Sequence, residues 1–134
     1  NHCFMADGKT FAARNPNDPA ALIHDTQQVL SWGQGRTWYL PKQVKLLTDG
    51  AIYSQLMMMK DGYTDGHHGA WIMDPPVFGY AFQSYWDAGY QIHIHNNGDA
   101  GMEVLLGELE KAMARNPRTG CPASTIAGFL TDFC

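Results

Sequence analysis

Residues 90–101, YQIHIHNNGDAG, concentrate polar side chains at the end of a short apolar run. His93 and His95 lie one residue apart, and Asp99 follows between two glycines. A neutral imidazole is the commonest protein ligand for a metal ion, and its second nitrogen needs an orienting partner. The segment therefore indicates metal-assisted chemistry, in which a bound ion activates water for hydrolysis.

Helices and strands alternate in the pattern of apolar residues, breakers and caps. Asp-Pro pairs at 18–19 and 74–75 are typical helix starts, because aspartate can cap a helix and proline suits its first position. The predicted elements are a helix from 19 to about 33, a strand at 42–48, a helix at 75–88, a strand at 90–95, and a helix at 100–115 capped by Asp99. Residues 1–16 and 33–41 are expected to form turns and loops. This order predicts an α/β fold of parallel βα units, in an open sheet or a barrel.

Parallel α/β folds bind ligands at the carboxyl ends of their strands. Asp49 lies at the end of the first predicted strand, and His95 and Asp99 lie at the end of the second. Lys45 stands between two apolar residues inside the first strand. A lysine in a buried strand is unfavourable unless it is paired or modified, so Lys45 is a candidate functional residue.

Each of these residues also has a purely structural interpretation. His93 shares a strand face with Gln91 and His95 and is explained by hydrogen bonding in the core. His95 can be a metal ligand or a structural histidine. Asp99 can act as a helix cap alone or can also orient a histidine. The sequence leaves these alternatives open.

Residues 49–73 are long, glycine-rich and irregular, and they contain Met, Tyr and Trp. Loops of more than about 12–15 residues in compact domains are usually functional or disordered. We expect a packed loop over the site, with Tyr53, Gln55, His67 and His68 as residues that face substrate. His67 and His68 could instead be exposed or hold a separate metal, although adjacent side chains point in different directions.

Composition limits the class of protein. The chain has 134 residues, 45% of them hydrophobic, and a formal net charge of −4, which argues against disorder and against nucleic-acid or anionic-membrane partners. No apolar run approaches the ~18–20 residues of a membrane span, and no signal-peptide pattern opens the chain. The three cysteines lack metal-ligand spacing, so a reduced cytoplasmic location is expected.

Two motifs together resemble a known family. VKLLTDGAIYSQ, followed about 40 residues later by GYQIHIHNNGDAGMEVLLGELEKAM, is similar to the strand motifs of amidohydrolase family 3, a branch of the metal-dependent amidohydrolase superfamily. The resemblance extends from Trp38 to Pro117 and more loosely back to Asp18. It implies that residues 1–134 form one partial domain, a segment of a (β/α)8 TIM-like barrel around strands four and five, with 49–73 as its active-site loop.

The resemblance also implies roles for individual residues. Lys45 matches the strand-four lysine that related members carboxylate to bridge two metals, and His95 matches the strand-five metal histidine. Asp49 and Asp99 match supporting aspartates, whereas His93 matches no ligand. The implied cofactor is one or two ions of zinc or another divalent metal. The implied reaction is hydrolysis of an amide or other C–N bond in a small molecule.

Several family features have no counterpart in this sequence. The first-strand HxH, the sixth-strand histidine and the eighth-strand aspartate are missing, and residues 118–134 lack the expected apolar-x-His strand. A catalytic zinc normally needs three protein ligands and an open position, so we expect the isolated chain to be inactive. The alternative is a non-catalytic α/β fragment or binding module that self-associates through its strand edges.

Overall fold

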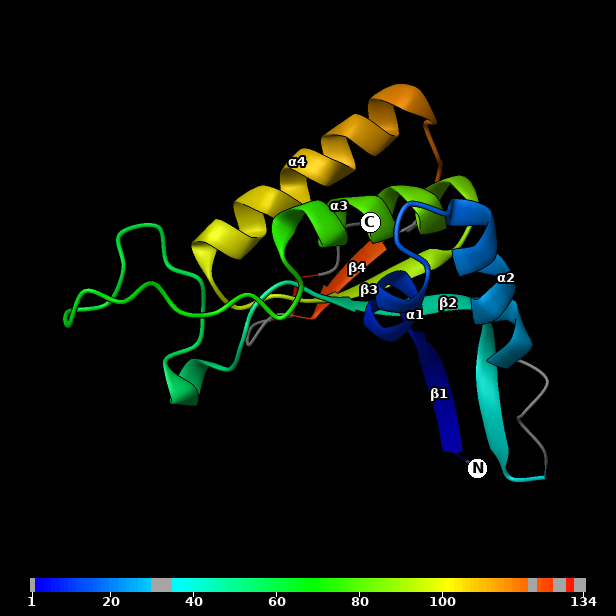
Figure 1. Ribbon diagram of the computed structural model, residues 1–134, viewed down its shortest axis with the longest axis horizontal. Helices are drawn as coiled ribbons and strands as arrows, with labels where there is room; N and C mark the ends of the chain where they lie inside the picture. Colours follow the sequence, from blue (N-terminus) through cyan, green and yellow to red (C-terminus); the bar gives the residue numbers. More distant parts are fainter. Residues whose placement is uncertain (1, 30–34, 121–122, 127–129, 132–134) are drawn as a thin grey trace.

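The computed structural model describes residues 2–29, 35–120, 123–126 and 130–131. Within them the chain forms five strands, four α-helices and one short 3-10 helix (Figure 1). In chain order the elements are β1 (His2–Asp7), α1 (Gly8–Arg14), α2 (Pro19–Val29), β2 (Thr37–Leu47), η1 (Ile52–Ser54), α3 (Pro75–Asp87), β3 (Gln91–His95), α4 (Asp99–Arg115), β4 (Ala123–Ile126) and β5 (Leu130–Thr131).

The strands form one sheet in the order β1-β2-β3-β4-β5. Strands β1 to β4 run parallel to their neighbours, and β5 runs antiparallel to β4. Helices connect the parallel strands: α1 and α2 follow β1, α3 follows β2, and α4 follows β3. The predicted α/β class with parallel βα units is therefore confirmed. None of the helices in the described ranges is long and apolar enough to cross a membrane.

The N-terminal segment differs from the expected turns. Residues 2–14 form β1 and α1, and β1 pairs in parallel with β2. Asp7 is the N-cap of α1, and its carboxylate accepts hydrogen bonds from Lys9 N at 3.1 Å and from Thr10 Oγ1 at 2.6 Å. Because β1 is stabilised by pairing with a strand distant in sequence, its short local pattern did not indicate it.

Strand β2 begins earlier than predicted, at Thr37 instead of residue 42. Its pairing with β1 shifts register between Tyr39 and Val44. Pro41, which has no backbone N–H to donate, and Lys42, with a φ of 56°, lie in this stretch. These residues resemble a loop in sequence, but the strand continues through the irregularity because β1 pairs on both sides of it.

The predicted helices correspond to α2, α3 and α4. The start of α2 is as expected, because Asp18 Oδ1 accepts a hydrogen bond from Ala21 N at 3.0 Å. The expected end of this helix, at Gly33, lies outside the described residues. Asp74 is the N-cap of α3 by position, but its side chain makes no capping hydrogen bond. Proline within the first turn of α3 removes one N–H that would otherwise need an acceptor.

The C-terminal segment contributes strands that were not predicted. Within residues 118–134, the tail that is atypical for the family, β4 pairs in parallel with β3 from Ile92–Ala123 to His95–Ile126. Backbone pairing with β3 needs no particular side-chain pattern, which explains why the sequence did not indicate β4.

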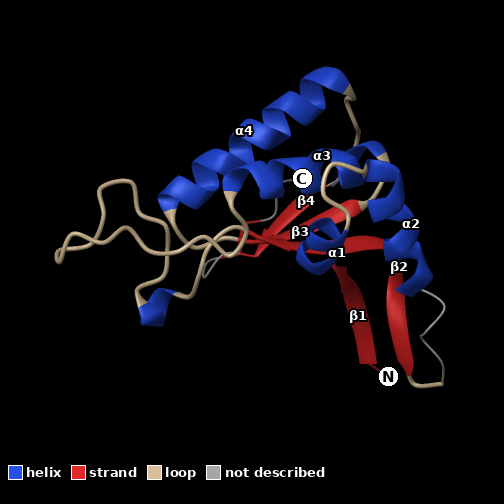
Figure 2. Ribbon diagram, in the orientation of Figure 1, coloured by secondary structure: helices blue, strands red, loops and turns tan. Residues whose placement is uncertain are grey.

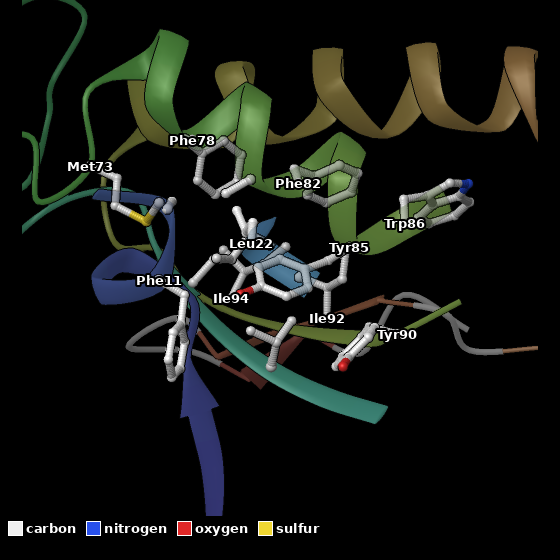
Figure 3. Packing of buried hydrophobic residues seen from close by; sticks show 14 of the residues in the cluster. Phe11, Leu22, Met73, Phe78, Phe82, Tyr85, Trp86, Tyr90, Ile92 and Ile94 are labelled. Atoms are coloured by element: carbon white, nitrogen blue, oxygen red, sulfur yellow. The ribbon is translucent and has the colours of Figure 1, made fainter. Parts of the chain in front are cut away.

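The hydrophobic core lies between the sheet and its helices (Figure 3). Its largest fully buried side chains include Phe78, Phe82, Tyr85 and Trp86 from α3, Val44 and Leu46 from β2, and Ile92 and Ile94 from β3. The rings of Phe82 and Trp86 stack with their centroids 5.9 Å apart. Val77, on the same helix, is 39% exposed. The core therefore joins one face of the sheet to one face of α3.

Residues 49–73 leave the carboxyl end of β2 and extend away from the sheet (Figure 1). The two ends of this loop are joined at its base, where Ile72 N donates to Thr48 O at 2.9 Å and Asp49 forms an antiparallel bridge with Trp71. Apart from η1, the segment is irregular, as predicted.

The core position of Phe82 leads to a stability prediction. Phe82→Ala should lower the free energy of unfolding by about 3–5 kcal/mol, because it leaves a cavity under α3. The matched control on the same helix, Val77→Ala, should change it by less than about 1 kcal/mol. Urea unfolding followed by circular dichroism measures both, and equal losses would contradict this core.

Candidate functional site

The candidate residues lie on the sheet face opposite the core. Figure 2 shows α3 and α4 together on one side of the sheet. Val44, Leu46, Ile92 and Ile94 are fully buried, and because successive strand residues point to opposite faces, the residues between them face the other way. The parallel register sets these residues side by side: Gln43 with Gln91, Lys45 with His93, and Leu47 with His95. All six are half-buried. We call this side of β2 and β3 the polar face, because five of the six residues, all but Leu47, are polar.

His95 is the last residue of β3, at the carboxyl end of the sheet. Its Nε2 lies 2.8 Å from Nδ2 of Asn97. Burial lowers the pKa of His95, the positive charge of Lys45 lowers it further, and Asp49 partly opposes both. The imidazole is therefore neutral near pH 7, which is the form that binds metal ions.

Lys45 is half-buried, and burial lowers its pKa. In the register it stands between His93 of β3 and Asp7 of β1. The Asp7 carboxylate accepts its hydrogen bonds from α1, and none of the described carboxylates forms an ion pair with Lys45. Its ammonium group therefore has a desolvation penalty that no described carboxylate offsets.

His93 pairs with Lys45 in the register of β2 and β3. It lies further from the carboxyl end of β3 than His95 does. Its Nε2 is 3.0 Å from Oε1 of Gln43, so Nε2–H donates to the amide oxygen. Burial, followed by the charge of Lys45, lowers the pKa of His93. This hydrogen bond fits the structural interpretation of His93.

Asp49 is fully buried and connects three parts of the chain. Its Oδ1 accepts hydrogen bonds from Asn97 N at 2.8 Å and from Thr48 Oγ1 at 3.1 Å. Its Oδ2 accepts from Gly98 N at 2.6 Å and from Met58 N at 2.9 Å. The carboxylate therefore holds the end of β2, the loop and the turn between β3 and α4 together.

Asp99 is not the N-cap of α4, which corrects the sequence prediction. Gly98 occupies that position, and Asp99 is the first helical residue. Asp99 Oδ1 accepts from Ala100 N at 2.9 Å and from Lys60 N at 3.0 Å. The amides that bind Asp49 are those of Asn97 and Gly98, just before the helix. Ala100 N also donates to the carbonyl oxygen of Met58 at 3.1 Å, so Asp99 and Ala100 join the loop to the start of α4.

Of the four predicted substrate-loop residues, Tyr53 and Gln55 are exposed, and His67 and His68 bond to other residues of the same loop. Tyr53 is 92% exposed, and Gln55 has a left-handed φ of 54°. His68 Nδ1 donates to the carbonyl oxygen of Met59 at 3.0 Å. Within the described ranges, no hydrogen bond or ion pair connects Tyr53, Gln55, His67 or His68 to Lys45 or His95.

His67 joins two arms of the loop. Its Nδ1 lies 2.6 Å from Asp65 Oδ1, and its Nε2 lies 2.9 Å from the carbonyl oxygen of Gln55. Both partners accept, so both ring nitrogens must carry hydrogen and the ring is an imidazolium. The Gln55 carbonyl and then Asp65 raise the pKa of His67, and Tyr63 stacks on the ring at a centroid distance of 4.4 Å. This arrangement leaves His67 without a lone pair for a metal.

Two residues contact the candidate histidines without having been predicted as site residues. Gln43 bonds His93, and Asn97 bonds His95. Period-two alternation on β2 places Gln43 on the same face as Lys45 and could have indicated it. Asn97 had no such signal, because its contact depends on how the turn after β3 folds back.

The described residues supply only part of a metal centre. Nowhere in the described ranges do three His, Cys, Asp or Glu side chains converge so that they could hold an ion. The polar face does bring the imidazole of His95 near Lys45, whose positive charge lowers the pKa of His95. Two side chains are fewer than the three protein ligands that a catalytic zinc normally needs.

No model of a known protein family matches the chain, and no curated protein matches it. A similar solved structure is that of an uncharacterized metal-dependent hydrolase from Pyrococcus horikoshii OT3, with a TM-score of 0.52 and 24% sequence identity. The match covers 66% of this chain and 19% of that chain, so this chain spans about a fifth of the hydrolase's length. The likeness shows a fold like part of a metal-dependent hydrolase.

Removing the Asp49 carboxylate should destabilise the chain strongly. Asp49→Ala leaves the amides of Met58, Asn97 and Gly98 without their acceptor. A buried N–H that loses its acceptor costs about 1–3 kcal/mol of stability. We expect a loss of at least about 3 kcal/mol in urea unfolding. The control Asp99→Asn affects an exposed carboxylate and should lose less than about 1 kcal/mol. A loss as small for Asp49→Ala as for the control would contradict the role of Asp49.

The His67 contacts should depend on pH. Because the pKa of His67 is raised in the folded loop, the bridge from Asp65 to Gln55 is complete at low pH. It is lost as the pH rises through that raised pKa. In an NMR titration, Asp65→Asn should move the pKa of His67 downward, whereas Asp61→Asn should not. The same pKa in Asp65→Asn and in the unmodified chain would contradict the bridge.

Proposed function

We propose that this chain supplies part of the metal centre of a hydrolase related to amidohydrolase family 3, with zinc or another divalent cation as cofactor. The observation that carries the proposal is the placement of neutral His95 and half-buried Lys45 on one polar face, toward the carboxyl ends of parallel strands. The similarity in fold to a metal-dependent hydrolase supports it. Asp49 and Asp99 act as supporting residues that hold the turn and the loop.

His95 would bind the metal through a ring nitrogen, and Lys45 would bind it as a carbamate. Burial increases the fraction of Lys45 that is a neutral amine, which is the nucleophilic form. The amine nitrogen adds to the carbon of CO2, so an N–C bond forms while one C=O π bond opens and its electron pair moves to oxygen. The proton released from nitrogen passes to solvent. The product is an anionic oxygen ligand, and the desolvated ammonium group is removed.

When bound, the metal would lower the pKa of a water molecule and polarise the substrate carbonyl. We assign as substrate a small molecule with an amide or related C–N bond, with the loop at 49–73, including Tyr53, Gln55, His67 and His68, moving to face it. We propose a cytoplasmic protein without a nucleic-acid or membrane partner. Two ligands are fewer than a catalytic zinc requires, so the isolated chain would not turn over substrate.

A second candidate is a non-catalytic α/β module that self-associates. Strand β1 lies at one end of the strand order, and its outer edge offers unpaired backbone groups. Phe4 on β1 and Trp38 on β2 are 50% and 57% exposed. Under this alternative, Lys45 and His95 are structural, and concentration-dependent dimers form without metal.

Zinc binding by the dialysed chain separates the two candidates. His95→Ala and Lys45→Ala should each weaken zinc affinity more than about 10-fold in calorimetric titration, because each removes a ligand. The matched control His24→Ala removes an exposed histidine of α2 and should leave affinity unchanged. Zinc content should be measured in parallel by elemental mass spectrometry.

Other outcomes would contradict the metal-centre proposal. If the unmodified chain binds no zinc, or if His95→Ala binds it as tightly, His95 is not a ligand. If His67→Ala alone abolishes binding, the metal lies in the loop. Dimers seen by light scattering in a chelator, with no zinc binding, would favour the self-associating module.

A further inference from the structure

The side-chain amide of Asn97 lies between a backbone carbonyl and His95. Its Nδ2 is 2.9 Å from the carbonyl oxygen of Gly50 and 2.8 Å from Nε2 of His95. The backbone N–H of Asn97 donates to Asp49 Oδ1 at 2.8 Å, so the residue is held at its main chain as well as at its amide. We infer that Asn97 is a positioning residue that sets the tautomer and the orientation of the His95 imidazole.

The Gly50 carbonyl determines which way the Asn97 amide faces. A carbonyl oxygen can only accept, so it must face the NH2 group, because the amide oxygen in that position would repel it. One amide hydrogen is therefore used by Gly50. The amide nitrogen has no lone pair available to accept, so its contact with His95 must use the second hydrogen.

This arrangement determines where His95 carries its proton. Nε2 accepts the hydrogen bond from Asn97, so Nε2 is unprotonated and the neutral ring carries its hydrogen on Nδ1. The lone pair of Nε2 is directed toward Asn97 at the carboxyl end of β3. A partner that can also donate, such as a hydroxyl in place of Gly50 O, would not impose this orientation.

The chemical meaning of this tautomer rests on the proposed function. A metal that binds through Nε2 requires an unprotonated Nε2, and Asn97 keeps it so before any ion is present. The amide also occupies that lone pair, so binding through Nε2 must displace one neutral hydrogen bond. The Asn97 amide would thus occupy the Nε2 lone pair until an ion binds. An arriving ion would then replace the amide at Nε2 without moving a proton on the ring.

The tautomer can be measured on the 15N-labelled chain, without metal, by long-range proton–nitrogen correlation at a pH where the ring is neutral. His95 signals are assigned by their loss in His95→Gln. The unmodified chain should show Nε2 at the frequency of an unprotonated ring nitrogen and Nδ1 at that of a protonated one. Asn97→Ala should shift both nitrogens toward averaged values, and Asn97→Asp, which has no amide hydrogen, should shift protonation to Nε2.

The control Gln43→Ala removes the partner of His93 and should change the His93 signals but not those of His95. A protonated Nε2 in the unmodified chain would overturn the inference without any variant, so a failure of the Asn97 variants to fold does not prevent the test. Unchanged His95 signals in folded Asn97→Ala would also overturn it. If the tautomer is as inferred but added zinc does not perturb His95, the metal-centre proposal fails and the positioning role of Asn97 stands.

Discussion

The buried carboxylate of Asp49 is the interaction on which the arrangement of the site depends. A carboxylate removed from water is strongly unfavourable unless hydrogen bonds replace its hydration. Here four donors do so, from the end of β2, from the loop and from the turn after β3. Those three segments carry Lys45, the candidate substrate residues and His95. One carboxylate thus sets the position of the loop and the turn relative to β2.

The two faces of the sheet divide structural and chemical roles. On β2 and β3 the residues that face α3, which are Val44, Leu46, Ile92 and Ile94, are apolar and fully buried. A charged group at these positions would be desolvated without a partner. Period-two alternation therefore confines Lys45, His93 and His95 to the opposite, polar face. Because side chains from adjacent strands are only one strand spacing apart, the charge of Lys45 lowers the pKa of His93 and of His95.

Much of the fold could be predicted because local patterns carry it. The Asp-Pro pairs and the spacing of apolar residues predicted α2 and α3. The segment QIHIH, which lies between a glycine turn and a Gly-Asp turn, predicted β3. The elements that were missed are β1, α1, the first half of β2, β4 and β5. Of these, β1, the first half of β2 and β4 exist through pairing with partners distant in sequence. Strand propensity depends on context, so short edge segments leave little local signal.

By itself, the sequence determined the α/β class, the alternation that puts Lys45 and His95 on one face, and the irregular loop at 49–73. These follow from periodicity and from breakers, which act within a few residues. Only the tertiary structure decided that Asp49 rather than Asp99 binds the amides before α4, that His67 bridges two arms of its loop, and that Asn97 contacts His95. Hydrogen bonds such as those that Asp49 accepts from the turn amides join residues far apart in the chain. Their geometry exists only once the backbone segments have been brought together.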